Sequence, residues 1–299
     1  MQTHKSIQFY RLRYIRLAWF LVGLTLLCGF AGTVLFALNR TTPVPASWGA
    51  AGGPRSELVD LLNALLQTVV MPVIAATLGV LIVRRQRSNR IAWLLLLTGL
   101  SSAAAIMTGE WAVYSHYTLQ TPLPLSGLAA WVTNWAWIAI YTLLLLMIAI
   151  FPEGRFLSPR WRWLIGVPLL LFSLPFLVAG AMETPMSSAY GLPNPFVAEN
   201  PQVLYDRLFA LSVPMMPLTA IAVLAEVLVR FGRARGIERQ QIKWLLAGVG
   251  LLVIMVVVGL VLALGLNLHI GDFMVNISSL APLLGIGVAL PPDRPQGQR

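Results

Sequence analysis

Acidic side chains within long apolar segments are the first places to look for chemistry in this sequence. Glu110 lies near the end of one such segment, and Glu226 precedes Arg230 by one helical turn, the spacing of an ion pair on one helix face. A proton or ion relay needs a row of charged side chains through the apolar region, and each of them is energetically expensive there. The sequence contains no such row. We therefore expect both glutamates to be interfacial or paired.

Motifs for nucleophilic, phosphate or metal chemistry are not found in the sequence. It has no Walker loop, zinc-protease motif, serine nucleophile elbow or dinucleotide-binding glycine pattern. The single cysteine, Cys28, lies in an apolar segment, and His4, His116 and His269 are far apart, so no thiolate or histidine metal site is expected. We expect no catalytic residue, no metal, no cofactor and no enzyme activity.

A group of aromatic and amide residues on two neighbouring apolar segments is a candidate ligand pocket. Its members are Trp111, Tyr114, Trp131, Asn134, Trp135 and Tyr141. Tryptophan and tyrosine gather at membrane interfaces, so an aromatic belt explains most of this group. Trp135 and Tyr141 lie deeper along their helix than a belt requires. An amphipathic ligand pocket in the outer leaflet is therefore the alternative.

Long apolar helices are the elements that must position these residues. Of the 299 residues, 58% are hydrophobic and 11% charged, and a soluble domain could not hide so much apolar surface from water. Apolar stretches recur that are long enough to cross a hydrocarbon core of about 30 Å. We predict an all-α polytopic membrane bundle of about eight transmembrane helices, forming a single domain over residues 1–290, with a short disordered cytoplasmic tail at 291–299. The expected spans are 17–38, 58–83, 91–114, 127–151, 163–182, 208–231, 244–266 and 273–290.

The lysines and arginines predict how the bundle is oriented. Of the 21 basic residues, only Arg40, Arg55 and Arg207 fall on one side of the eight-span pattern. Basic loops stay in the cytoplasm, so both termini are expected there, in a bacterial cytoplasmic membrane. The formal net charge of +10 is clustered between apolar stretches, and it therefore indicates topology and a lipid bilayer as partner, not nucleic acid.

Short segments at the expected cytoplasmic ends of helices carry a family resemblance. They are residues 87–94 (RSNRIAWL), 151–163 (FPEGRFLSPRWRW) and 236–244 (GIERQQIKW). They resemble the membrane-embedded N-terminal region of bacterial two-component sensor histidine kinases, where an FP-acidic-GR loop and a later ERQQ segment recur at the cytoplasmic ends of helices. As an alternative, the segments serve only as interfacial turns, with RQQ starting a helix.

The sequence departs from that family after the last expected helix. Sensor kinases continue into a helix with a phosphoacceptor histidine and an ATP-binding domain, whereas this sequence becomes rich in proline and arginine from Ala289 onward. The resemblance thus implies a kinase-less membrane sensor for signal transduction to a cytoplasmic signalling protein. The candidate partner contacts are Arg155, Arg160, Arg239, Gln240, Gln241 and Lys243. A small-molecule or lipid transporter and a structural subunit of a membrane protein complex are the alternatives.

Overall fold

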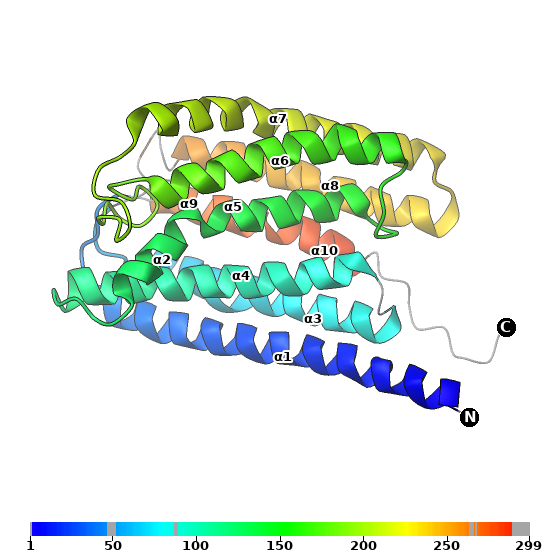
Figure 1. The fold of residues 1–299 in the computed structure, drawn as a ribbon, viewed down its shortest axis with the longest axis horizontal. Helices are drawn as coiled ribbons and strands as arrows, with labels where there is room; N and C mark the ends of the chain where they lie inside the picture. Colours follow the sequence, from blue (N-terminus) through cyan, green and yellow to red (C-terminus); the bar gives the residue numbers. More distant parts are fainter. Residues whose placement is uncertain (1, 47–51, 87–88, 263–265, 267, 289–299) are drawn as a thin grey trace.

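The computed structural model describes residues 2–46, 52–86, 89–262, 266 and 268–288, and its regular elements in that part are helices (Figure 1). In chain order they are α1 (Gln2–Asn39), α2 (Leu58–Leu65), the π-helical turn η1 (Leu66–Val70), α3 (Met71–Arg85), α4 (Arg90–Val113), the π-helical turn η2 (Tyr114–Thr118), α5 (Ser126–Ile150), α6 (Pro159–Met182), α7 (Gln202–Arg233), α8 (Gly236–Leu260), α9 (His269–Ser278) and α10 (Leu280–Val288).

Eight helical segments in the described part of the chain are long and apolar enough to cross a membrane, as the sequence predicts. They are Arg13–Asn39, Leu58–Arg85, Arg90–Thr118, Ser126–Ile150, Pro159–Met182, Gln202–Arg233, Gly236–Gly259 and His269–Val288. Large apolar side chains such as Phe30, Ile221 and Ile254 are exposed on their surfaces, as contact with lipid requires. This is the architecture of a multi-pass membrane protein.

The helices run beyond the apolar stretches from which they were predicted. α1 begins at Gln2 and not near residue 17, and α6 begins at Pro159 and not near residue 163. The segment 236–244, for which the alternative was an interfacial turn with RQQ starting a helix, forms the first turns of α8, RQQ included. Hydropathy marks only the apolar part of a helix, whereas its hydrogen bonding continues into polar flanks. Residues 289 and 290 of the last expected span, and the tail 291–299, lie outside the described residues.

The bundle has two different ends (Figure 1). At one, which we call the loop-rich end, lie the connections that follow Asn39, Thr118, Met182 and Leu260. At the other, which we call the arginine-rich end, lie the short connections that follow Arg85, Ile150 and Arg233, together with the start of α1 and the end of α10.

Hydroxyl pairs and small residues join the helices within the bundle. Hydrogen bonds of 2.8 to 2.9 Å link Thr33 with Thr68, Thr108 with Thr133, and Thr142 with Ser173. At Gly248 of α8, an added Cβ would lie 2.5 Å from the carbonyl oxygen of Ala281 in α10. Hydroxyl hydrogen bonds and close glycine contacts are typical of helix packing in membranes, where lipid is as apolar as the side chains.

Candidate functional site

The connection between α5 and α6 forms one wall of a cleft at the arginine-rich end. The chain turns at Gly154, whose φ of +75° lies in the left-handed region that favours glycine. An added Cβ there would lie 3.1 Å from Asn89 Oδ1, so the glycine also lets this connection approach the start of α4. The turn ends at Ser158, the N-cap of α6.

An ion pair on α7 anchors this connection. Glu226 is 0% and Arg230 3% exposed, and Arg230 Nη2 donates a hydrogen bond of 3.1 Å to Glu226 Oε1. The same oxygen accepts a hydrogen bond of 2.5 Å from the backbone N–H of Leu157, and Arg230 Nη2 also donates to the carbonyl oxygen of Arg155 at 3.0 Å. The pair indicated by the spacing of Glu226 and Arg230 is therefore present, and it holds the connection against α7.

The cleft brings together all three segments that carry the family resemblance. Its volume is about 570 Å³, and residues 155–159 form much of its lining. Arg90 contributes from segment 87–94, Glu153 and Arg162 from 151–163, and Glu238 from 236–244. Arg230 of α7 also lines it. Segments that lie far apart in the sequence thus form one charged site.

The predicted partner contacts lie in and beside this cleft. Arg155 lines it, and its Nε donates a hydrogen bond of 2.5 Å to Glu153, which raises the pKa of Arg155. Arg160 is exposed at the start of α6, and Gln241 is half-buried on α8. The remaining contacts form what we call the docking face. They are Arg239, Gln240 and Lys243, which are exposed and spaced to share one side of α8.

The docking face is partly ordered by a contact within the α7–α8 hairpin. The guanidinium carbon of Arg239 lies 5.1 Å from the ring centre of Phe231, a cation–π arrangement. This contact restrains Arg239 while leaving it exposed. A restrained, exposed guanidinium loses less conformational entropy when a partner binds.

At the loop-rich end, the polar groups of Trp131 and Asn134 are occupied by the chain itself. Trp131 Nε1 donates to the carbonyl oxygen of Ala181 at 2.8 Å. Asn134 Nδ2 donates to the carbonyl oxygen of Gly180 at 2.8 Å, and Asn134 Oδ1 accepts from the backbone N–H of Ser188 at 2.8 Å. These two residues therefore anchor the end of α6 and the connection that follows it.

The other residues of the candidate ligand pocket lie in separate groups. Trp111 packs against Tyr114 and donates to the carbonyl oxygen of Pro124. Trp135 packs against Trp131, whereas Tyr141 packs against Trp137. A cavity at this end is lined by other residues, 201–204 and 207 at the start of α7. An outer-leaflet pocket among the six stays a prediction.

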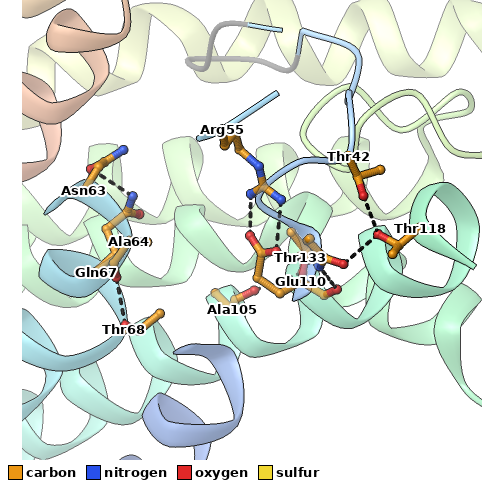
Figure 2. Close-up of polar contacts among 11 residues, drawn as sticks. Thr42, Arg55, Asn63, Ala64, Gln67, Thr68, Ala105, Glu110, Thr118 and Thr133 are labelled. Atoms are coloured by element: carbon orange, nitrogen blue, oxygen red, sulfur yellow. Dashed lines mark hydrogen bonds and ion pairs between the residues drawn. The ribbon is translucent and has the colours of Figure 1, made fainter. Parts of the chain in front are cut away.

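A second ion pair lies at the loop-rich end, and sequence reasoning did not find the partner of Glu110. Figure 2 shows Arg55 reaching from the connection between α1 and α2 to both carboxylate oxygens of Glu110. Arg55 Nη2 is 3.0 Å from Oε2, and Nη1 donates to Oε1. Asn39 Nδ2 donates to Oε2 and to the backbone carbonyl of Glu110, each at 2.8 Å. The carboxylate is thus almost completely enclosed, with Glu110 only 5% exposed.

Neighbouring groups extend this network across the loop-rich end. Burial opposes the charge on Arg55, but Tyr190 and Glu110 outweigh it and raise the pKa of Arg55 above its ordinary value. Thr118 Oγ1 donates to Asn39 Oδ1 at 2.8 Å and lies 2.9 Å from Thr42 Oγ1. The network therefore joins α1, its following connection, α4 and η2.

Polar side chains also meet between α2 and α9. His269 Nδ1 lies 2.7 Å from Asp60 Oδ1, so this histidine, which was expected to be isolated, has an acidic partner. Deeper in the bundle, Asn276 Nδ2 donates to Asn63 Oδ1 at 3.1 Å, and Gln67 Nε2 donates to the same oxygen at 3.2 Å. We call this row the polar seam.

Comparisons with known proteins do not assign the chain to a class. A scan against protein-family models, a search of characterised proteins and a search of solved structures found no significant match. The resemblance to sensor kinases therefore stays a prediction.

Proposed function

We propose that this chain is a membrane sensor module that passes a signal to a cytoplasmic protein, as the membrane region of a two-component sensor kinase does. The observation that supports this best is the cleft at the arginine-rich end, where three segments distant in sequence meet beside the docking face. In this proposal the arginine-rich end lies in the cytoplasm, since basic connections resist translocation.

α7 is the element that would carry a signal between the two ends. Near its start, Tyr205 Oη donates to Glu183 Oε1 at 3.3 Å, which ties α7 to the loop-rich connection. Near its end, Glu226 and Arg230 hold the cleft. Pro214 and Pro217 lie within the helix, and each removes a backbone hydrogen bond and permits bending. In this proposal α7 has two stable conformations that differ in its bend. A shift of the α6–α7 connection would favour one of them and so change the shape of the cleft.

The docking face provides the test of this proposal. We expect Arg239→Ala combined with Gln240→Ala to weaken recovery of the cytoplasmic partner in a pull-down by at least tenfold, because truncating contacts in a desolvated interface typically costs about 2 kcal/mol or more. Expression and thermal stability should stay near those of the unmodified protein, since both side chains are exposed.

A matched variant separates partner docking from a general effect of charge. Arg84→Ala with Gln86→Ala also removes one arginine and one glutamine that are exposed at the arginine-rich end. Partner recovery should be unchanged by this control. Equal recovery from both variants would leave only membrane anchoring for Arg239 and would contradict the docking proposal.

The proposed orientation predicts which single-cysteine variants react from outside the cell. In a Cys28→Ala background, a cysteine at Ser187 in the loop-rich end should react with an impermeant maleimide added to intact cells. A cysteine at Ser158 in the arginine-rich end should react only after the cells are opened. Reaction at Ser158 in intact cells would reverse the orientation and remove the cytoplasmic docking face.

The polar seam favours a transporter as the second candidate function. It places Asp60, Asn63, Gln67, His269 and Asn276 along one helix contact, from the loop-rich end toward the middle of the spans. Polar residues at membrane depth commonly mark transport paths. Solute uptake into liposomes that Asp60→Asn abolishes would support this function over the sensor.

A further inference from the structure

We propose that the cleft at the arginine-rich end binds the phosphate-bearing headgroup of an anionic lipid. The inference requires a membrane around the bundle, but it does not depend on the sensor function or on the docking face. It rests on cleft arginines that have no carboxylate partner among the described residues, on the N-terminus of α6 and on the level of the cleft along the bundle.

Arginines without a carboxylate partner face the cleft. Within the described part of the chain, Arg155 is paired with Glu153, whereas no carboxylate pairs with Arg90 or Arg162. The guanidinium carbon of Arg162 lies 5.4 Å from the ring centre of Trp163, which leaves its N–H groups available. Guanidinium groups match phosphate oxygens in geometry and charge.

Arg230 supplies a second and independent sign of a missing acceptor. It is 3% exposed and lines the cleft, yet its Nε has no hydrogen-bond partner among the residues described. An unsatisfied buried donor of this kind is unfavourable. An anion seated in the cleft would place acceptor oxygens and negative charge beside Arg230.

The N-terminus of α6 adds backbone donors to the same space. α6 has 24 residues and begins at Pro159, and the side chain of its N-cap residue Ser158 makes no capping hydrogen bond. The first N–H groups of a helix have no acceptor within it. With the helix dipole they form a site that favours phosphate, and both Ser158 and Pro159 line the cleft.

The position of the cleft at the ends of the candidate spans favours a lipid headgroup over a soluble phosphate as the ligand. Five candidate spans have an end near the cleft. Three begin there, at Arg90, Pro159 and Gly236, and two end there, at Ile150 and Arg233. This is the level at which hydrocarbon gives way to headgroups.

Apolar side chains beside the cleft can hold the acyl chains. Trp163 is 63%, Leu164 56% and Ile237 56% exposed. Trp163 and Leu164 come after the cleft residue Arg162, and Ile237 precedes the cleft residue Glu238. Basic pockets between membrane helices on the cytoplasmic side are typical binding places for anionic headgroups. A free phosphate would make no use of these apolar neighbours.

The experiment is a titration of the purified full chain in detergent with phosphatidylglycerol, and with phosphatidylcholine in parallel, read by native mass spectrometry. We expect saturable binding of phosphatidylglycerol, with an apparent Kd raised about tenfold or more by Arg90→Gln with Arg162→Gln, since each basic residue contributes about 1 kcal/mol near an anionic surface. Arg90→Lys with Arg162→Lys keeps the charge and should retain most of the binding.

Controls define the results that would overturn the inference. Arg84→Gln with Arg85→Gln removes the same charge from exposed positions of the same end, outside the cleft, and should change the Kd less than about twofold. Equal weakening by both double variants, or equal binding of phosphatidylcholine, would overturn the site. Displacement of the lipid by millimolar inorganic phosphate would assign the cleft to a soluble anion. If the glutamine variant unfolds, the lysine variant decides, because loss of binding with lysine present contradicts charge recognition.

Discussion

Glu110→Leu should lower the free energy of unfolding by about 3 kcal/mol or more, because it leaves the charge of Arg55 enclosed without its partner. Among the described residues, the Arg55 guanidinium would keep its contacts with the rings of Phe36 and Tyr190, at 5.2 and 5.9 Å, and Asn39 would lose an acceptor. Chemical unfolding of the purified protein in detergent, followed by tryptophan fluorescence, measures the change.

Two further variants show whether the loss of stability comes from the unpaired charge of Arg55. Glu199→Leu alters an exposed carboxylate of the same end and should change stability by less than about 0.5 kcal/mol. Arg55→Leu combined with Glu110→Leu should recover much of the loss, since no uncompensated charge remains. A Glu110→Leu protein as stable as the unmodified one would show that the ion pair does not hold the loop-rich end.

Glu226→Leu is expected to lower the free energy of unfolding by a comparable amount and, in addition, to release the connection between α5 and α6 at the arginine-rich end. Arg230 would lose its carboxylate partner and Leu157 the acceptor of its backbone N–H, so the expected loss is again about 3 kcal/mol or more. The connection after α5 should then detach from α7. Limited digestion with trypsin should cut after Arg155 at least tenfold faster, because cleavage follows the population of the open connection.

Glu238→Gln is the matched control for this result. Glu238 also lines the cleft, and no hydrogen bond of its side chain to the connection is present in the described part of the chain. Its replacement should leave cleavage after Arg155 within about twofold. Unchanged cleavage in Glu226→Leu would mean that the connection is held by other contacts and would weaken the role given to α7.

The helices could be predicted because each leaves a local signal in the sequence. Long apolar stretches such as 127–151 mark a span without any knowledge of its neighbours, and the corresponding helix is Ser126–Ile150. Helix ends were predicted less well because polar flanks continue the hydrogen bonding unmarked by hydropathy. The eighth span is also divided, with α9 ending at Ser278 and α10 beginning at Leu280, and hydropathy does not signal that break.

The site could be predicted only where its contacts are local. Glu226 and Arg230 share a helix face at the spacing of i and i+4, so their pairing follows from sequence. Arg55 and Glu110 are 55 residues apart, and only the packing of α1 against α4 brings their segments together. The cleft likewise depends on tertiary structure.

The polar seam did leave a signal in the sequence. Asp60, Asn63 and Gln67 repeat at intervals of three and four residues, as do His269, Asp272 and Asn276. Each set therefore lies on one helix face, and two such polar faces in apolar helices are expected to meet. The three histidines were compared with one another and not with the polar residues beside them, so this pattern was missed.

The most direct test of the sensor proposal is to identify the protein that binds at the docking face. A photo-crosslinking amino acid placed at Gln240 in living cells, with Gln202 at the loop-rich end as a control that is also exposed, identifies that protein by mass spectrometry of the adduct. The proposal predicts a cytoplasmic signalling protein, such as a kinase or response regulator, joined at Gln240 and not at Gln202. Adducts at Gln240 only with integral membrane subunits, or the same adducts at both positions, would contradict it.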